Sequence, residues 1–287
     1  MQLDDNYLQL YEEALRYAKV GDVYTAVKLL KKVNRIVPDW PGGYLALGEL
    51  YFGRREWKPA FHYLSKTVGL NADDREAWWK LGLAAAGLKR QRTAQNVWNK
   101  FGAGTVDRHR PLGLQIGQAG GEVEILWMQP LDAARGRILS IPHPGSRQRY
   151  RDLVLYDRRN QAATTVVQQR RVAIYPLLDT LKKSPYRTFS CLLHTSAEEA
   201  IDQLEQLCLD AGLGFEVWSN ASRSLQLSPD NAAARDSFPE YYADLHDNRG
   251  NGTALVALAA IHPAEVERVL NDWQIITLAQ YSDLRNY

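Results

Sequence analysis

The sequence predicts a multidomain protein of the α + (α+β) class: a helical solenoid, then a small β-barrel-like sheet, then an α/β sandwich. Three observations support this prediction. Residues 7–102 repeat with a period of 34, which is typical of stacked helix pairs. Between residues 122 and 180, apolar and polar residues alternate as in half-buried strands. Beyond residue 181, strand and helix patterns follow one another. The predicted domains are 1–104, 122–180 and 181–287, with a linker at 105–121.

Positions 34 residues apart carry side chains of similar size in the N-terminal third. Four sets of equivalent positions show this: Leu10, Tyr44 and Trp78; Ala14, Gly48 and Gly82; Ala26, Ala60 and Ala94; Leu30, Leu64 and Trp98. A small residue in each helix lets two backbones approach, and a large residue fills the gap above them. The pattern resembles the tetratricopeptide repeat (TPR), three times over. Arg55 and Lys89 depart from it, because they replace the family's usual turn glycine.

The TPR resemblance implies that a partner protein binds the concave face lined by the first helix of each repeat. The family's groove positions correspond here to Tyr11, Leu15, Leu45, Glu49, Phe52, Trp79 and Leu83. Most of these residues are apolar, which suits an amphipathic helix. Alternatively, the chain fills this groove with its own C-terminal half.

One subclass of the family binds the acidic C-terminal tails of chaperones through a carboxylate clamp of Lys and Asn. The matching positions here are Tyr11, Leu15, Ala46, Glu76 and Lys80. The clamp is therefore absent, and we do not expect binding to chaperone tails.

The region after the repeats has β character. Residues 102–121 are rich in Gly, which predicts a linker. Strand patterns follow in Val123–Leu131, Arg137–Ile141, Leu153–Tyr156 and Thr164–Ile174, the last long enough for one bent strand or two. Four or five short strands suggest a small barrel or curled sheet.

The C-terminal region alternates strands and helices. The expected elements are a strand at Arg187–His194, a helix from the N-cap Ser196 to Ala211, a hairpin of Phe215–Trp218 and Ser224–Leu227, a strand at Thr253–Ala260, a helix at Ala264–Trp273 and a last strand at Ile275–Leu278. This order suggests a ferredoxin-like α/β sandwich.

The sequence contains no recognised catalytic or cofactor-binding motif. Phosphate-binding glycine loops, a nucleophile elbow and metal-ligand spacings of His or Cys are all missing. We therefore expect no enzyme activity, no cofactor and no metal. Cys191 and Cys208 are expected to be small buried hydrophobes. The first residues do not resemble a signal peptide and no apolar run is long enough to span a membrane, so we expect a cytoplasmic protein.

Two charged surfaces are candidate binding sites. Residues 135–171 contain nine Arg against Asp152 and Asp157, and Arg147, Arg149 and Arg151 alternate in one loop. This basic surface suits a solvated face, an acidic protein partner or, least favoured of the three, nucleic acid. The second surface is an acidic aromatic loop formed by Glu240, Tyr241, Tyr242, Asp244 and Asp247. It could meet a basic protein, or it could be a solvated insertion.

The leading hypothesis is a non-enzymatic TPR scaffold or adaptor that holds an apolar segment of a partner protein. A second hypothesis rests on a resemblance of about 60 residues to small bacterial domains of unknown function, carried by the tryptophan strand, Ile141-Pro142 and Asp152-Leu153-Val154. Some such domains are immunity proteins, which implies neutralisation of a toxin. Nucleic-acid binding by the arginine-rich β domain is a third, and an enzyme site between barrel and sandwich a fourth. The partner's identity and the oligomeric state stay open.

Overall fold

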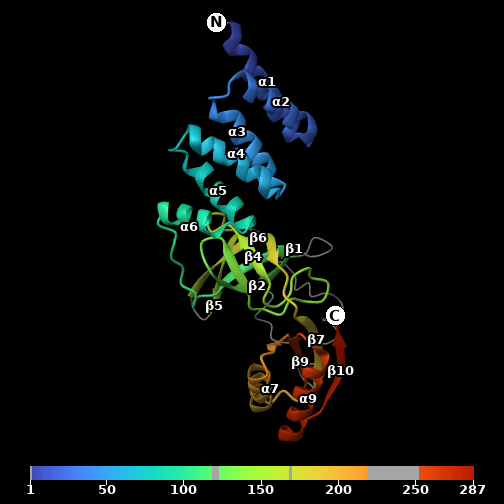
Figure 1. Cartoon of the computed structure of the whole chain (residues 1–287). Helices are drawn as coiled ribbons and strands as arrows, with labels where there is room; N and C mark the ends of the chain where they lie inside the picture. Colours follow the sequence, from blue (N-terminus) through green and yellow to red (C-terminus); the bar gives the residue numbers. More distant parts are fainter. Residues whose placement is uncertain (1, 118–122, 168–169, 219–251) are drawn as a thin grey trace. The chain divides into compact units, whose positions relative to one another are not determined.

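A computed structural model of the chain describes residues 2–117, 123–167, 170–218 and 252–287 (Figure 1). The chain forms two compact units. The first comprises Met1–Val106 together with Asp132–Ala134, and the second comprises Asp107–Leu131 and Arg135–Tyr287. The predicted β and α/β domains lie together in the second unit, and their limits at 122–180 and 181–287 stay predictions.

Six helices make up the first unit and stack in sequence order (Figure 1). They are α1 (Gln2–Lys19), α2 (Val23–Ile36), α3 (Pro41–Gly53), α4 (Trp57–Leu70), α5 (Arg75–Gly87) and α6 (Gln91–Lys100). Asp22 and Asp74 begin α2 and α5, because their carboxylates accept hydrogen bonds from the amides of Thr25 and Ala77. The helices pair into three helix–turn–helix repeats, so the predicted array of three stacked helix pairs is confirmed.

Small residues bring the two helices of each repeat together. A Cβ added to Gly48 in α3 would lie 2.8 Å from Cγ of Leu64 in α4, and one added to Gly82 in α5 would lie 2.7 Å from the Trp98 ring in α6. Arg55 and Lys89 adopt positive φ values of 59° and 60° in the turns between helices. The family's usual glycine suits this conformation, so both turns keep their shape despite the substitution.

The close approach at Gly48 predicts opposite effects on stability for two glycine-to-alanine substitutions in helix α3. Gly48→Ala is expected to lower the free energy of unfolding by about 1–3 kcal/mol, because the new methyl group would overlap Leu64. Gly53→Ala in the same helix meets open space and is expected to raise it by about 0.5–1 kcal/mol. Urea denaturation followed by helical circular dichroism measures both. Equal effects of the two substitutions would contradict this packing.

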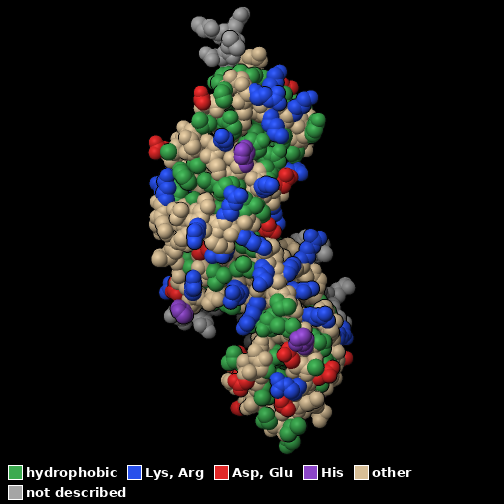
Figure 2. Space-filling model, viewed as in Figure 1, with side chains coloured by type: hydrophobic (Ala, Val, Ile, Leu, Met, Phe, Trp, Pro, Cys, Tyr) green, Lys and Arg blue, Asp and Glu red, His purple; other side chains and the backbone are tan. Residues whose placement is uncertain are grey.

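The second unit begins with a five-stranded closed barrel, which confirms the predicted small barrel. Its strands are β1 (Leu112–Gly117), β2 (Val123–Pro130), β3 (Arg135–Ile138), β4 (Leu153–Tyr156) and β6 (Arg170–Lys182), and β5 (Ala163–Val167) extends the sheet beside β6. Neighbours are antiparallel except β1 and β6, whose parallel pairing closes the barrel. Lys and Arg side chains gather on the face seen in Figure 2.

The predicted linker at 105–121 is partly wrong, because Leu112–Gly117 forms strand β1. Leu114 and Ile116 point into the barrel core and are buried. Gly113 lies opposite Ile174 in β6, and a Cβ on it would come within 2.7 Å of that side chain. A glycine that indicates a linker in the sequence thus permits close strand pairing. The predicted strand at Thr164–Ile174 is two strands, β5 and the start of β6.

A four-stranded antiparallel sheet with two helices completes the second unit. Its elements are β7 (Arg187–Leu193), α7 (Glu198–Asp210), β8 (Gly214–Val217), β9 (Ala254–Ala260), α9 (Pro263–Thr277) and β10 (Tyr281–Asn286). The strand order is β10-β7-β9-β8. Both helices cover one face, with Leu204, Val266 and Trp273 in the shared core (Figure 1).

Two details of this region differ from the prediction, and a third lies where the structure describes no residues. Ile275–Leu278 is not a strand: α9 continues to Thr277 and ends at Leu278 with a φ of 58°, and the last strand is β10. The N-cap position of helix α7 is Ala197, which makes no side-chain capping hydrogen bond, and not Ser196. The second hairpin strand predicted at Ser224–Leu227 lies outside the described residues.

Candidate functional site

The seven residues predicted to line a groove all lie on the first helices of the repeats. Helix α1 carries Tyr11 and Leu15, α3 carries Leu45, Glu49 and Phe52, and α5 carries Trp79 and Leu83. In a solenoid of helix pairs, first helices from successive repeats lie side by side on one face.

A set of polar interactions connects the three first helices. Nζ of Lys80 in α5 lies 2.5 Å from Oε1 of Glu49 in α3 and 3.5 Å from Oε1 of Glu76. Burial, and then the negative charge of Glu49, raise the pKa of Tyr11 in α1. Burial alone would lower the pKa of Lys80, but the two glutamates outweigh it and raise the pKa overall. Tyr11, Glu49 and Lys80 therefore belong to one surface.

Apolar side chains that are accessible lie on the first helices of the first two repeats. Leu15 is 41% exposed, and Leu45 is half-buried. The half-buried ring of Tyr11 packs edge-on against Trp40 with centroids 4.9 Å apart, and that of Phe52 against Trp57 at 5.5 Å. These edge-to-face contacts fix the rings while part of each stays accessible.

The third repeat contributes differently, because Trp79 and Leu83 are buried with exposures of 3% and 0%. The Trp79 ring lies 4.8 Å from the Trp98 ring, centroid to centroid, and 6.4 Å from Phe101. The predicted groove is therefore accessible at its residues in α1 and α3, while its α5 residues contribute to packing.

The positions of a carboxylate clamp offer no free cation. Lys80 is the one cationic residue among them, and two carboxylates already surround its ammonium group. Ala46 is buried with 7% exposure. An incoming carboxylate would have to displace Glu49 or Glu76 from Lys80.

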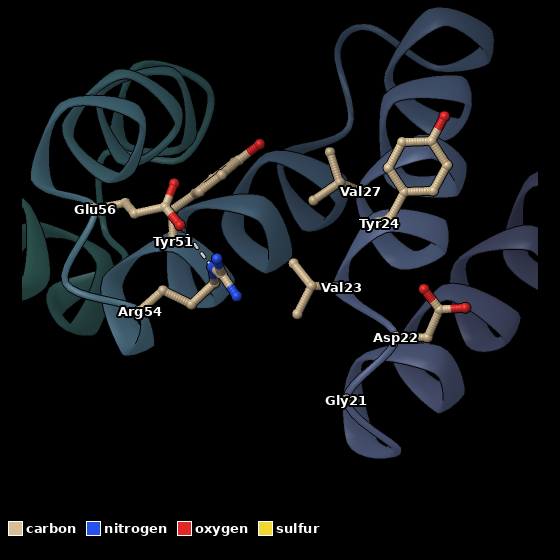
Figure 3. A pocket seen from close by; sticks show the side chains of 8 residues that line it. All are labelled: Gly21, Asp22, Val23, Tyr24, Val27, Tyr51, Arg54 and Glu56. Carbon is tan, nitrogen blue, oxygen red and sulfur yellow. Dashed lines mark hydrogen bonds and ion pairs between the residues drawn. The ribbon is translucent and has the colours of Figure 1, made fainter.

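A pocket of about 520 Å3 lies between the first two repeats (Figure 3). Figure 3 shows Val23 and Val27 of α2 facing Tyr51 and Arg54 across it, with Arg54 paired to Glu56 at 2.6 Å. Sequence reasoning missed this pocket, because its walls come from a turn, a helix start and a helix end that follow no common motif.

The arginine loop of the second unit is fastened by a buried carboxylate. Asp152 has no exposed side-chain surface, and it accepts hydrogen bonds from the amides of Ser184 at 2.7 Å and Arg149 at 3.0 Å. Lys183 lies 3.4 Å from the same carboxylate and also donates to the Arg147 carbonyl. The guanidinium of Arg151 lies over the rings of Tyr150 and Tyr186, at 5.4 and 5.5 Å. All three predicted arginines are exposed on this fixed loop.

The other predicted features give little chemistry. The acidic loop of Glu240, Tyr241, Tyr242, Asp244 and Asp247 lies outside the described residues. Among the residues that the structure describes, no group of three or more His, Cys, Asp or Glu is placed to hold a metal ion. None of the described helices combines the length and apolarity needed to cross a membrane.

The two cysteines are buried thiols in the core of the sheet and its helices. Burial, and secondarily neighbouring negative charge, raise the pKa values of Cys191 and Cys208 to about 12. Because the thiolate is the reactive form, neither should react with Ellman's reagent in the folded protein at about pH 8. Both should react after unfolding in guanidinium. Rapid reaction of the folded protein would contradict the burial.

Comparison with known proteins places no family on this chain. No family model matches it, and no curated protein does. Among solved structures, the first TPR of Spaghetti (RPAP3) bound to an HSP90 peptide is 22% identical over 33% of this chain and 75% of that one, with a TM-score of 0.31. MamA is 25% identical over a match that covers 33% of this chain and 56% of MamA, with a TM-score of 0.31. The match therefore spans about half of MamA. A hypothetical protein from Neisseria gonorrhoeae is 12% identical over a match that covers 60% of this chain and 91% of that protein, with a TM-score of 0.24.

Proposed function

We propose that this chain is a protein-interaction scaffold that holds an apolar segment of a partner against the first helices of its TPR array. The observation that carries the proposal is the set of accessible apolar residues on α1 and α3, namely Tyr11, Leu15, Leu45 and Phe52, with Glu49 also on α3. Its apolar residues recur along α1 and α3 at helical spacing, which fits the ridge of an amphipathic helix.

Two further features support an apolar ligand over an acidic tail. Lys80 is already surrounded by Glu49 and Glu76, so the surface offers no unpaired cation at the clamp positions. The exposed Glu49 would repel a carboxylate and favour a ligand with a cation beside its apolar side chains.

Several finer points belong to the same proposal. We take the protein to be non-enzymatic and cytoplasmic, without a cofactor. The order β-α-β-β-α-β with strand order β10-β7-β9-β8 supports a ferredoxin-like class for the C-terminal sandwich. Toxin neutralisation, the special case suggested by the sequence, stays a prediction.

Selection from a display library of amphipathic helical peptides tests the proposal. The double variant Tyr11→Ala/Phe52→Ala should bind the selected peptides about 30-fold more weakly or worse. Truncating an aromatic anchor at an interface reduces the binding free energy by about 2 kcal/mol or more. Tyr24→Ala is the matched control, since Tyr24 is an 80% exposed aromatic of the same unit that lines the pocket of Figure 3. Loss in the control and none in the double variant would place the binding site at the pocket and refute the groove.

A further inference from the structure

The exposed charge of the barrel is almost entirely positive. In the described part of residues 107–187, twelve Lys and Arg side chains are exposed, ten of them Arg, whereas Asp107 is the one exposed acid. The other described acids of this region are buried or half-buried; Asp152 is fully buried and Glu124 is 8% exposed. A surface with this balance attracts a polyanion. Figure 2 shows Lys and Arg gathered over this region.

Two of these cations lie in one row across three neighbouring strands. Arg137 of β3 is opposite Leu153 of β4, and Leu153 is opposite Lys182 of β6. Leu153 is the common neighbour of both residues, beside a register shift between β4 and β6, and both side chains are exposed, so Arg137 and Lys182 lie on the accessible surface of the barrel. Neither side chain forms an ion pair with a described carboxylate, and both are exposed.

An aromatic side chain lies on the same outer face. Leu126 and Met128 of β2 point into the barrel core, so Trp127 between them points outward. Its backbone carbonyl accepts from the amide of Leu139, next to the strand that carries Arg137. The Trp127 ring is half-buried and is not among the members of the barrel core that contains Leu126 and Met128.

The arginine loop adjoins this face, because its Arg151 amide donates to the carbonyl of Ile138 at the end of β3. Asp152 holds its backbone, and the rings of Tyr150 and Tyr186 support the Arg151 side chain. A loop held in this way presents its guanidinium groups with less loss of conformational freedom on binding.

We propose that this outer face of the barrel binds single-stranded nucleic acid, a function separate from the TPR groove. Arg137, Lys182 and the loop arginines contact phosphates, and Trp127 stacks on a base. Arginine predominates over lysine on this surface, and its planar fork matches phosphate oxygens. An aromatic ring among the cations is what single-stranded nucleic-acid sites use, because every base offers a face on which the ring can stack.

Fluorescence anisotropy of a labelled oligothymidylate with the full chain tests the proposal. The wild type should bind, and contact with about four phosphates should weaken binding about 50-fold between 50 and 200 mM salt. At a given salt concentration, the double variant Arg137→Glu/Lys182→Glu should bind the oligothymidylate about 20-fold more weakly than the wild type. The matched control Lys31→Glu/Lys32→Glu makes the same charge change on exposed residues of α2 and should change binding less than about 3-fold.

Two more measurements decide the class of ligand. Trp127→Ala should weaken binding about 10-fold at every salt concentration and leave the salt slope unchanged, because stacking releases no counterions. Polyglutamate should displace the labelled oligothymidylate less well than unlabelled oligothymidylate does, when the two polymers are compared at equal concentrations of negative charge. The proposal would be overturned if the wild type did not bind at low salt, or if both charge variants lost the same amount of binding. Equal competition by polyglutamate would also overturn it, in favour of an acidic protein as the ligand. If Arg137→Glu/Lys182→Glu fails to fold, Arg137→Ala/Lys182→Ala provides the same comparison with a smaller expected loss.

Discussion

Replacing Trp98 by alanine is expected to lower the free energy of unfolding of the helical-repeat unit by about 3–5 kcal/mol. Trp98 is fully buried in α6, its ring lies 4.8 Å from that of Trp79 in α5, and it fills the space above Gly82. The cavity left by the indole cannot be closed by the small residue opposite. Urea denaturation followed by the helical circular dichroism signal measures the change.

Two companion variants make this result specific. Trp98→Phe should cost less, because the ring keeps most of its packing and the buried indole N–H of Trp98 has no hydrogen-bond partner to lose. Tyr24→Ala removes an aromatic ring that is 80% exposed and should change the free energy of unfolding by less than about 0.5 kcal/mol. Similar losses from Trp98→Ala and Tyr24→Ala would mean that the repeats are not packed as described.

Replacing Asp152 by alanine is the second large effect, expected to cost about 3 kcal/mol in the second unit. The amides of Ser184 and Arg149 would each lose an acceptor in a buried or half-buried place. The half-exposed Lys183 would return to water and contributes little to this cost. Because the carboxylate fastens the arginine loop, the loop should also open locally.

Limited trypsin digestion reports that local opening. Cleavage after Arg147, Arg149 or Arg151 should be faster in Asp152→Ala than in the wild type, at temperatures where both stay folded. Asp107→Ala is the control, since Asp107 forms an exposed pair with Arg110 at 3.5 Å and should leave both stability and cleavage nearly unchanged. Unchanged cleavage of the loop in Asp152→Ala would contradict the role given to this carboxylate.

Local side-chain size was enough to predict the repeats, but long-range pairing was not visible in the sequence. Gly48 and Gly82 mark helix contacts within one repeat, so their spacing is readable. Gly113 has the same steric role, yet its neighbour Ile174 is far along the chain, and the glycine-rich stretch was therefore predicted to be a linker. The polar strand β10 was missed, because an edge strand needs few apolar residues.

The candidate site was predicted in part for similar reasons. Family positions predict a groove on α1, α3 and α5, but they do not say which side chains stay accessible. Trp79 packs on Trp98, whereas Leu15 remains exposed, and this difference depends on the neighbours of each residue. The alternation of the loop arginines indicated a common surface, but the buried Asp152 that holds it could not be recognised from its position in the sequence.

Site-specific photo-crosslinking tests the proposed binding surface most directly. A photoreactive phenylalanine derivative replaces Leu15, which is exposed on α1, or the exposed Lys28 on α2 as the matched position off the groove. Groove binding predicts that the probe at position 15 captures an apolar helical segment of a partner, mapped by mass spectrometry, and that the probe at position 28 does not. Equal capture at both positions, or crosslinks from position 15 only to this chain's own C-terminal half, would contradict the proposal that the TPR array holds a partner.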